Sequence, residues 1–406
     1  DVNSLFRFKK LLSYYKESVV FTKKIFYNSN FKTISNSIKY SYFFIPSSVN
    51  IKKNTFSLVC LSFKILFLSI KNNFNLFYFF NKIIFTYLRY EYLFEKYNSK
   101  YLLHDRFYRS CSLRNHLFKK KGGSLIGCTQ IHIPEASISL YFETDILFSF
   151  GNESYSKNKI NKLGGSIKKV VPVGSLKMEH LWNGSKKYTS RAPSSDIILI
   201  GLNPMNWLKL SKRMVDNYYT QYEWMKKLSK KFPDYKIIIK HHPNFKGDDI
   251  ESNILKDTKI KSVINSNFLK KRHAQYSNIK KFPNLFFRKF NISINFIDDL
   301  IFEKNSDSYN FMNSSRIVLS FGSTMILEGV GMNKKSFFLD PKKQNTTFFK
   351  YLNHLNSIRI TNYNQLEKVV INISKSKNIK KSKRNQICLE SSQASKKIFN
   401  YFNKSN

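Results

Sequence analysis

The sequence is short of acidic residues and has few cysteines. Its 406 residues include 26 Asp and Glu against 69 Lys and Arg, which gives a formal net charge of +43. The four cysteines lie far apart and no two of them have Cys-x-x-Cys spacing: Cys60, Cys111, Cys128 and Cys388. With only 8 histidines as further ligands, this pattern predicts neither a metal site nor a disulfide framework, and it favours a reducing, cytoplasmic environment. Because the chain begins at Asp1 rather than Met, we expect that it is processed or a fragment.

Long apolar runs are also missing. No run reaches the roughly 18 uncharged residues that a transmembrane helix needs. The nearest are residues 56–70, interrupted by Lys64, and residues 74–88, which contain Lys82. Both place aromatic residues between cations, a pattern that suits a helix lying in a membrane interface. The more common alternative is a core helix of a Lys-rich protein, so peripheral contact with an anionic membrane is one of two open interpretations.

The positive charge is a weak indication of a nucleic-acid partner. Only 12 of the 69 basic residues are Arg, and the chain is rich in Lys, Asn, Phe and Ile, which AT-rich codons favour. The basic residues are spread along the chain, whereas nucleic-acid-binding proteins usually gather them on one element. We therefore expect no nucleic-acid partner. Distributed lysines still create a positive potential that attracts an anionic membrane.

Alternating strand and helix patterns predict an α/β protein with two Rossmann-like domains. A chain of this length can bury two cores. Short apolar runs alternate with helical patterns over residues 100–174 and again from residue 196, as in parallel, doubly wound sheets. Residues 182–195 are polar and predict a linker. We expect an N-terminal domain over 1–185, a C-terminal domain over 190–390, and a last helix within 391–406 that returns to the N-terminal domain. The two domains are expected to face an interdomain cleft.

Two segments give less information. In the first 100 residues Phe and Lys obscure the periodicity, so no elements are predicted there. Residues 375–384 are strongly basic and are predicted to form a solvated loop.

Between Arg316 and Pro341 the sequence predicts a buried strand, a Ser/Gly/Ser/Thr turn and the start of a helix. The free backbone N–H groups of a helix N-terminus, together with the helix dipole, suit an anion. Glu328 lies about one turn beyond Thr324, where its carboxylate can accept hydrogen bonds from sugar hydroxyls. The alternative is an ordinary βαβ crossover in which Ser323 or Thr324 is only an N-cap.

A second predicted strand, residues 235–240, runs into His241, His242 and Pro243. In open α/β sheets, ligands bind beyond the carboxyl ends of the strands. Proline restricts the backbone of the residue before it, so His242 would be held on a stiff loop in that crevice. A loop histidine without a catalytic role is the alternative. The occurrence of both segments in one chain favours a ligand site.

These two segments resemble motifs of a known group of enzymes. Lys-His-His-Pro (240–243) and Ser-x-x-Ser-Thr-x-x-x-Glu-Gly (320–329) are similar to motifs in the C-terminal halves of bacterial surface-polysaccharide glycosyltransferases with the GT-B fold. That group includes capsule and lipopolysaccharide Kdo and sialic acid transferases and CDP-glycerol glycerophosphotransferases. The resemblance covers roughly residues 196–341 and indicates the superfamily better than the substrate.

The resemblance also implies roles for residues. It implies that His242 contacts the donor phosphate or assists departure of the nucleotide, that Ser323 and Thr324 hold phosphate, and that Glu328 holds the ribose. Lys240, His241 and Gly322 complete the predicted donor-binding set. The chain contains no Asp-x-Asp motif, so we expect metal-independent transfer with no cofactor besides the nucleotide-sugar co-substrate.

The general base is expected to come from the N-terminal domain. Glu135 is the first candidate, because it follows a segment, residues 127–132, that resembles the Gln-His loop of those transferases. Asp105 is the second candidate, and Asp145 is expected to cap or start a strand. The interpretation that none of the three is the base has equal weight. His132 is a further candidate for the acceptor side.

The predicted activity is transfer of a sugar from a nucleotide-activated donor, with a CMP-linked sugar as one candidate, to a surface-polysaccharide or lipopolysaccharide acceptor. The predicted partners are therefore the nucleotide-sugar donor and a glycan or glycolipid acceptor. One alternative is a polyol-phosphate transferase of the CDP-glycerol type, or a nucleotide-sugar epimerase, on the same fold. The other is a non-catalytic basic protein that binds RNA or an anionic membrane.

Overall fold

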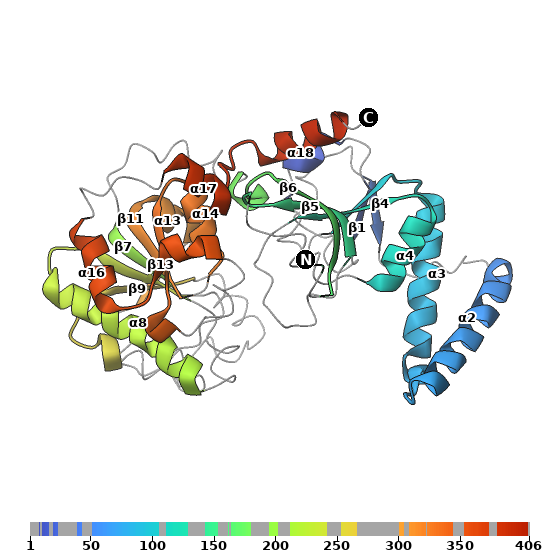
Figure 1. Ribbon diagram of the computed structural model, residues 1–406, viewed down its shortest axis with the longest axis horizontal. Helices are drawn as coiled ribbons and strands as arrows, with labels where there is room; N and C mark the ends of the chain where they lie inside the picture. The colour runs from blue at the N-terminus through green and yellow to red at the C-terminus, as the bar shows by residue number, and fades with distance from the viewer. Residues whose placement is uncertain are drawn as a thin grey trace, which may run out of the picture. The chain divides into compact units, whose positions relative to one another are not determined.

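The structure is a computed structural model. It describes residues 8, 10–15, 19–22, 39–42, 51–104, 111–128, 143–152, 161, 164–179, 195–201, 212–241, 253–265, 300–303, 308–321, 323–343, 353–372 and 380–404. The chain divides into two compact units, unit 1 (Asp1–Ser149, Tyr155–His180 and Gln393–Asn406) and unit 2 (Phe150–Ser154 and Leu181–Ser392). Each unit contains a parallel sheet with helices (Figure 1), which confirms the predicted α/β class with two Rossmann-like parts. The predicted linker, apart from Ser195, lies outside the described residues.

Unit 1 is built on a four-stranded parallel sheet in the order β3-β4-β5-β6. Its strands are β3 (Tyr101–His104), β4 (Ser124–Cys128), β5 (Glu143–Ser149) and β6 (Ser166–Pro172). All four lie within residues 100–174, where the sequence predicts alternating strands and helices. Helix α4 (Ser112–Lys120) precedes β4 and ends just before Gly122, whose φ of +81° favours glycine. A separate pair of parallel strands, β1 (Val19–Thr22) and β2 (Lys39–Tyr42), also belongs to this unit.

The last helix, α18 (Ala394–Asn403), belongs to unit 1 although its sequence follows that of unit 2. Its apolar residues Ile398 and Phe402 are buried in one core cluster with Phe148 of β5. At its start, the carboxylate of Glu179 accepts hydrogen bonds from the backbone N–H of Ser395 (2.8 Å) and from the Ser395 hydroxyl. The helix therefore completes the core that the unit 1 sheet begins.

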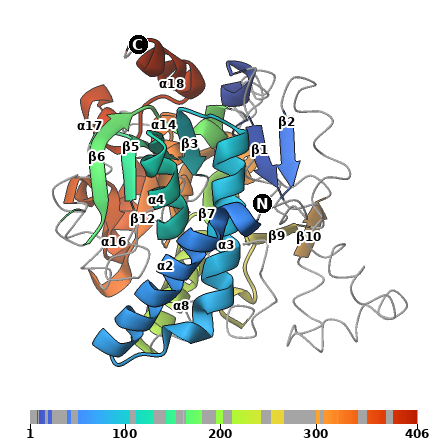
Figure 2. The same ribbon diagram turned by 90° about the vertical axis from the view of Figure 1, so that its right-hand side faces the viewer.

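Two helices form a hairpin on unit 1. Helix α2 (Ile51–Lys71) leads through the short 3-10 helix η2 (Leu76–Phe79) into α3 (Phe80–Lys96), and Figures 1 and 2 show α2 and α3 side by side. Helix α3 buries Leu93 and Phe94 against Leu117 and Phe118 of α4. Helix α2 packs on η2 and α3. Among the helices in the described part of the chain, none is long and apolar enough to cross a membrane.

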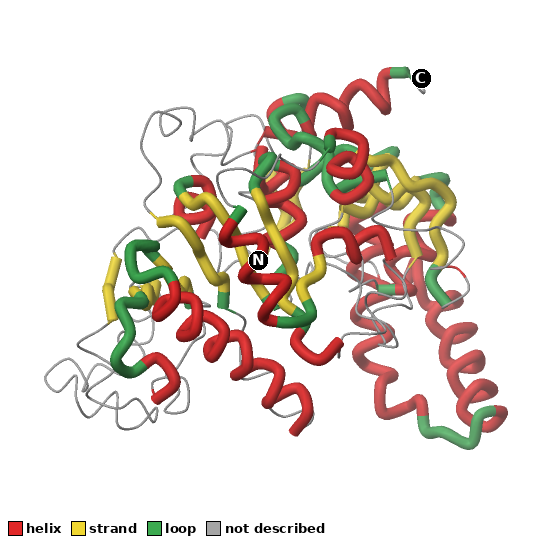
Figure 3. Tube along the Cα trace, turned by 60° about the vertical axis from the view of Figure 1, so that its left-hand side comes forward, coloured by secondary structure: helices red, strands yellow, loops and turns green. Residues whose placement is uncertain are grey.

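Unit 2 is built on a seven-stranded parallel sheet in the order β10-β9-β8-β7-β11-β12-β13. In Figure 3 the strands of the protein are yellow and its helices red. The strands are β7 (Ser195–Ile200), β8 (Ile237–Lys240), β9 (Lys261–Asn265), β10 (Leu300–Glu303), β11 (Ser315–Ser320), β12 (Lys335–Leu339) and β13 (Arg359–Ile360). Its helices are α8 (Lys212–Lys231), α13 (Ser308–Asn313), α14 (Met325–Gly331), α16 (Tyr363–Ile371) and α17 (Lys381–Ile387), with 3-10 helices η6 (Pro341–Lys343) and η7 (Asn353–Ile358). Helices α8 and α16 share a core cluster with the sheet, and α13 and α14 contact β7, β11 and β12. Burial on both faces explains why these strands read as continuous apolar runs.

The prediction of a basic loop over residues 375–384 is wrong for residues 381–384, which belong to a helix. Residues 381–387 form helix α17, and residues 373–379 lie outside the described residues. Ile387 and the following Cys388 are 1% and 0% exposed, and α17 packs on α14. The basic residues that suggested a loop lie on the outer side of a short helix whose end is anchored by these two buried side chains.

Candidate active site

Three strands of the unit 2 sheet bring the two predicted motifs to one edge. Ile200 of β7 is the register partner of Lys240 in β8. On its other side β7 pairs with β11, and Leu199 faces Leu319, so Ser320 stands next to Ile200. Lys240 and Ser320 are therefore two strand spacings apart, about 10 Å along the edge. All three strands are parallel, so this is the carboxyl edge, where α/β sheets bind ligands.

The end of β8 holds two buried polar residues. Lys240 and His241 are each 1% exposed. The Lys240 ammonium donates a hydrogen bond to the His241 carbonyl (3.4 Å), and the His241 N–H donates to Val263 of β9 (2.9 Å). Burial lowers the pKa of His241 from 6.5 to about 3, and the neighbouring Lys240 charge adds to this effect. His241 is thus neutral at physiological pH.

The turn after β11 is organised by serine hydroxyls. The Ser320 hydroxyl donates to the Ile200 carbonyl (2.7 Å) and accepts from the Ser323 N–H (3.3 Å). The Ser323 hydroxyl accepts from the Met325 N–H (3.3 Å), while Thr324 is the N-cap residue of α14 without a capping bond from its own side chain. The side-chain hydrogen bond to the first turn of α14 therefore comes from Ser323 and not from Thr324. Ser320 links the turn directly to the end of β7.

Glu328 lies inside the fold in α14, one turn below Thr324. It is 4% exposed, and its carboxylate accepts a hydrogen bond from the Tyr309 hydroxyl of α13 (2.6 Å). Tyr309 has no signal in the sequence, because a tyrosine in the helix before a strand belongs to no motif. No role was predicted for Ser320, although a serine at the end of an apolar strand is the pattern that marks it.

The structure thus places Lys240, His241, Ser323 and Thr324 at one edge of the unit 2 sheet, with Glu328 in the helix that follows. Four other predicted site residues lie outside the described residues: His242, Gly322, Glu135 and Asp105. Their predicted roles stay predictions. His132 lies outside as well. In the described part of the chain, no group of three or more His, Cys, Asp or Glu side chains is arranged to hold a metal ion.

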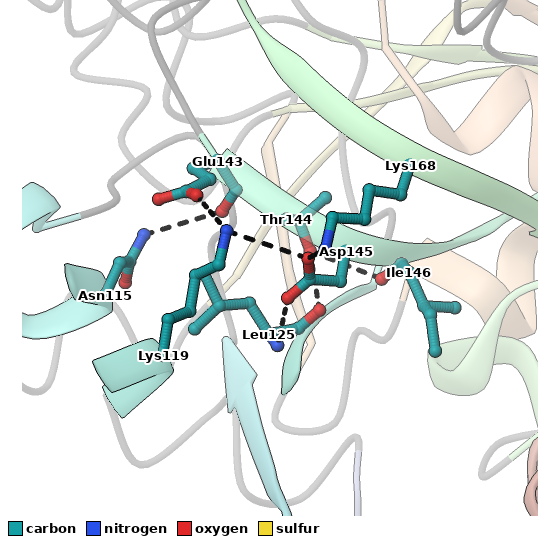
Figure 4. Close-up of polar contacts among 8 residues, drawn as sticks. All are labelled: Asn115, Lys119, Leu125, Glu143, Thr144, Asp145, Ile146 and Lys168. Carbon is teal, nitrogen blue, oxygen red and sulfur yellow. Dashed lines mark hydrogen bonds and ion pairs between the residues drawn. The ribbon is translucent and has the colours of Figure 1, made fainter. Parts of the chain in front are cut away.

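Asp145 belongs to the sheet of unit 1 and lies near its amino-terminal edge, among hydrogen-bonding and charged partners (Figure 4). It lies near the start of β5 and its carboxylate accepts a hydrogen bond from the Leu125 N–H (2.8 Å). Lys168 approaches the carboxylate at 2.9 Å and Lys119 at 3.9 Å, and Lys119 also bonds Glu143 at 2.5 Å. Burial raises the pKa of Asp145, but the Leu125 N–H and the two lysines outweigh it, so the pKa lies below its usual value.

This environment excludes Asp145 as a general base. A carboxylate that is stabilised in its ionised form is a poor proton acceptor. It also lies at the amino ends of β4, β5 and β6, whereas ligands bind at the carboxyl ends. The expectation that Asp145 has a strand-starting role agrees with these contacts.

No protein-family model matches the sequence, and the comparison with curated proteins finds no match. Solved structures that are similar include a UDP-GlcNAc 2-epimerase from Neisseria meningitidis bound to UDP-GlcNAc, with 11% identity, a TM-score of 0.47, and coverage of 100% of this chain and 98% of that chain. A UDP-GlcNAc 2-epimerase from Methanocaldococcus jannaschii has 12% identity, a TM-score of 0.43, and coverage of 79% and 82%. A mutant O-GlcNAc transferase from Thermobaculum terrenum has 7% identity, a TM-score of 0.35, and coverage of 77% and 54%. At this level, similarity establishes neither the family nor the function of this chain.

Proposed function

We propose that this protein is a glycosyltransferase that moves a sugar from a nucleotide-activated donor to a surface-polysaccharide or lipopolysaccharide acceptor. The observation that supports the proposal is the convergence of Lys240 and His241 with the Ser320–Thr324 turn at the carboxyl edge of one parallel sheet. A cation, neutral N–H donors and hydroxyls at this edge match a phosphate group in charge and hydrogen bonding. The buried carboxylate of Glu328, a helical turn away, matches a ribose.

The proposed reaction breaks the bond between the anomeric carbon and the nucleotide phosphate oxygen, and forms a bond from that carbon to an acceptor hydroxyl oxygen. The acceptor proton passes to a general base, for which Glu135 and Asp105 are the candidates. Negative charge grows on the leaving phosphate, where the Lys240 ammonium and the proposed His242 imidazolium would neutralise it. His241 cannot supply a proton there, because its depressed pKa keeps it neutral. A CMP-linked sugar is one donor that the proposal includes.

A nucleotide thermal-shift panel with CMP, CDP, UDP and GDP tests the donor site. One nucleotide should stabilise the protein by about 2.7 kcal/mol at 100 times its dissociation constant. Glu328→Ala should weaken that binding, whereas the matched control Glu223→Ala, at an exposed position of α8, should leave it unchanged. If none of the four nucleotides stabilises the unmodified protein, the proposal is wrong.

The products then separate the reactions that such a site can support. With a donor sugar and a glycan acceptor, a transferase releases free nucleotide and extends the glycan. A polyol-phosphate transferase releases CMP from CDP-glycerol. A nucleotide-sugar epimerase needs no acceptor. It inverts one carbon of the sugar, and most of the sugar remains attached to the nucleotide at equilibrium. Epimerisation without any transfer would replace the proposed reaction while retaining the donor site.

A further inference from the structure

The outward side of helix α2 is apolar. Six large side chains on it are 42–80% exposed, and we call them the α2 apolar face: Phe56, Val59, Phe63, Leu66, Phe67 and Ile70. At about 100° per residue these positions fall within an arc of about 100° on one side of the helix. Ile65, on the opposite side, is only 4% exposed. The α2 apolar face is therefore a continuous stripe four turns long.

The inward side of α2 is itself largely apolar, because Leu58, Leu61 and Leu68 are partly buried there and Ile65 is buried. It contains Ser62 and Ser69, whose hydroxyls donate to the carbonyls of Leu58 and Ile65 one turn earlier (2.8 and 2.7 Å). A helix of a water-soluble protein normally places its serines outward and its phenylalanines inward. In α2 the phenylalanines lie outward although the inward side is already apolar, which indicates that the outward side meets an apolar environment in the working protein.

Exposed apolar residues are concentrated on this hairpin. Among the described residues, ten large apolar side chains are exposed, and nine of them lie between Phe56 and Phe85. The connection between α2 and α3 adds Phe74 and Phe77, which are 55% and 43% exposed. A monomeric soluble protein rarely leaves such a contiguous patch uncovered unless it is an interaction site.

Charge indicates what covers the face. From residue 18 to residue 90 the sequence contains ten Lys and Arg residues and no Asp or Glu. Lys64 and Lys71 are exposed and, by helical position, border one side of the α2 apolar face. A second copy of this chain would bring the same cations against each other, and the whole chain carries a net charge of +43. An anionic lipid surface instead offers hydrocarbon to the aromatic residues and negative charge to the lysines.

We propose that the α2–α3 hairpin docks the protein on an anionic phospholipid membrane, with α2 lying in the interface and its apolar face in the acyl region. The inference is independent of the proposed enzymatic activity, because it uses no residue of unit 2. Docking of this kind would hold the protein at the surface where a lipid-linked acceptor is found.

Co-sedimentation with lipid vesicles tests the proposal. The unmodified full chain should bind vesicles of phosphatidylcholine mixed with phosphatidylglycerol, and bind phosphatidylcholine vesicles at least about tenfold more weakly. Replacing Phe56, Phe63 and Phe67 together by Ser should reduce the affinity for the mixed vesicles at least about tenfold. The matched control is Ile371→Ser, an exposed apolar residue of unit 2, which should bind as the unmodified chain does.

The charge contribution is tested separately. Lys64→Glu with Lys71→Glu should weaken binding about tenfold at 0.1 M salt and much less at 1 M, where the screening length falls from about 10 Å to about 3 Å. The pair Lys230→Glu and Lys256→Glu, at exposed positions of unit 2, changes the net charge equally and should have a much smaller effect. Circular dichroism of each variant shows whether it is folded.

A fluorescent label on α2 of the otherwise unmodified chain tests the same proposal, and this measurement does not depend on the folding of any variant. Cys60 is exposed on α2, whereas Cys111 is partly buried and Cys128 and Cys388 are buried. An environment-sensitive fluorophore on Cys60 should shift to the blue with the mixed vesicles and not with phosphatidylcholine alone. Absence of this shift, or equal vesicle binding by the triple Ser variant, would overturn the proposal. Dimerisation without lipid would also overturn it. If analytical ultracentrifugation shows that the unmodified chain is a dimer and the triple Ser variant a monomer, the α2 apolar face joins two copies of the chain.

Discussion

His241 and Asp145 are titratable residues in the two different parallel sheets. His241 follows the carboxyl end of β8 in unit 2, and Asp145 lies near the amino end of β5 in unit 1. His241 is buried beside Lys240 at a carboxyl end, and the pKa of its imidazole falls to about 3. Asp145 is held by Leu125 N–H, Lys168 and Lys119 at an amino end, and its pKa also falls. The first is therefore a neutral imidazole at a carboxyl edge, and the second is an anion held by two lysines at an amino edge.

The buried His241 should make stability depend on pH. Its folded pKa of about 3 lies below the unfolded value of 6.5, so between these values the unfolded state binds one more proton than the folded state. Stability from this group is fully present above pH 6.5 and is lost as pH falls toward 3, by up to about 1.4 kcal/mol per pH unit. The free energy of unfolding, measured in urea at several pH values between 6.5 and 4, should depend less steeply on pH for His241→Gln than for the unmodified protein. The difference in slope should correspond to about one proton. Equal slopes for the two proteins would contradict the neutral, buried assignment.

His242 and Glu328 should give different kinetic signatures if the donor site is as proposed. His242→Ala should lower kcat by roughly 10²–10⁴, because a general acid acts mainly in the transition state. Glu328→Ala should instead raise the KM for the donor with a smaller effect on kcat, because a ribose is bound alike in both states. Steady-state kinetics with the donor found by the thermal-shift panel measures both. A fully active His242→Ala protein, or a Glu328→Ala protein with unchanged donor affinity and reduced kcat, would refute these roles.

The position of Lys240 and His241 at the end of a buried strand was predictable from the sequence. Lys240 and His241 follow a run of three isoleucines, and a buried strand that ends in polar residues marks a carboxyl edge. Tyr309 could not be predicted, because its hydrogen bond to Glu328 depends on how α13 and α14 pack. Sequence also cannot show that burial makes His241 neutral, since this depends on every side chain packed around it.

Among the elements, strands such as β7, β8 and β11 were predictable, whereas β9, β10 and β13 were not. Residues 56–70 and 74–88 were candidates for helices, but their pairing as a hairpin was not predictable. Strands buried on both faces give uninterrupted apolar runs such as residues 197–200 and 317–319. In α2 the exposed side is as apolar as a core-facing side, so the usual contrast between two helix faces is missing. Helix α17 was missed for a different reason. Its seven residues include only one apolar residue, Ile387, and burial against α14 stabilises it rather than its own sequence pattern.

The packing of α17 on α14 can be tested at Gly331. A Cβ added to Gly331 would lie 2.7 Å from the Cys388 sulfur and 3.2 Å from the Leu389 carbonyl oxygen. Gly331→Ala should therefore destabilise unit 2 by about 1–3 kcal/mol, despite the better helix propensity of Ala. Cys388→Ala removes the sulfur, so the double variant should lose less stability than the sum of the single variants, by about 0.5–3 kcal/mol. Strict additivity in urea unfolding would show that the two residues are not in contact.

At the scale of the whole molecule, each unit has its own hydrophobic core. One core cluster contains Trp224 and the strands of unit 2, and two others contain the strands and helices of unit 1. The two-unit organisation followed from strand and helix alternation on both sides of a polar stretch. The assignment of residues 150–154 to unit 2 had no sequence signal, because it depends on backbone hydrogen bonds from Asn152 to Asn385 and from Leu389 to Phe150.

The last helix should support unit 1 and not unit 2, although unit 2 is its neighbour in sequence. Phe402 is 6% exposed, and its ring lies 4.3 Å from that of Tyr101 and 5.7 Å from that of Phe148, between centroids. Phe402→Ala should therefore destabilise unit 1 by about 3–5 kcal/mol. The control Phe85→Ala, at a residue 49% exposed, should change stability by less than about 0.5 kcal/mol.

Spectroscopy can assign this loss to one unit, because Trp224 is buried in the core of unit 2 and the other two tryptophans, Trp182 and Trp207, can be replaced by Phe in every variant. Tryptophan fluorescence therefore follows unfolding of unit 2, while far-ultraviolet circular dichroism follows both units. For Phe402→Ala the dichroism should show an added transition at lower urea, and the fluorescence midpoint should stay where it is in the unmodified protein. An equal shift of both signals would mean that the units unfold as one cooperative body. No shift in either signal would mean that Phe402 does not pack in the unit 1 core.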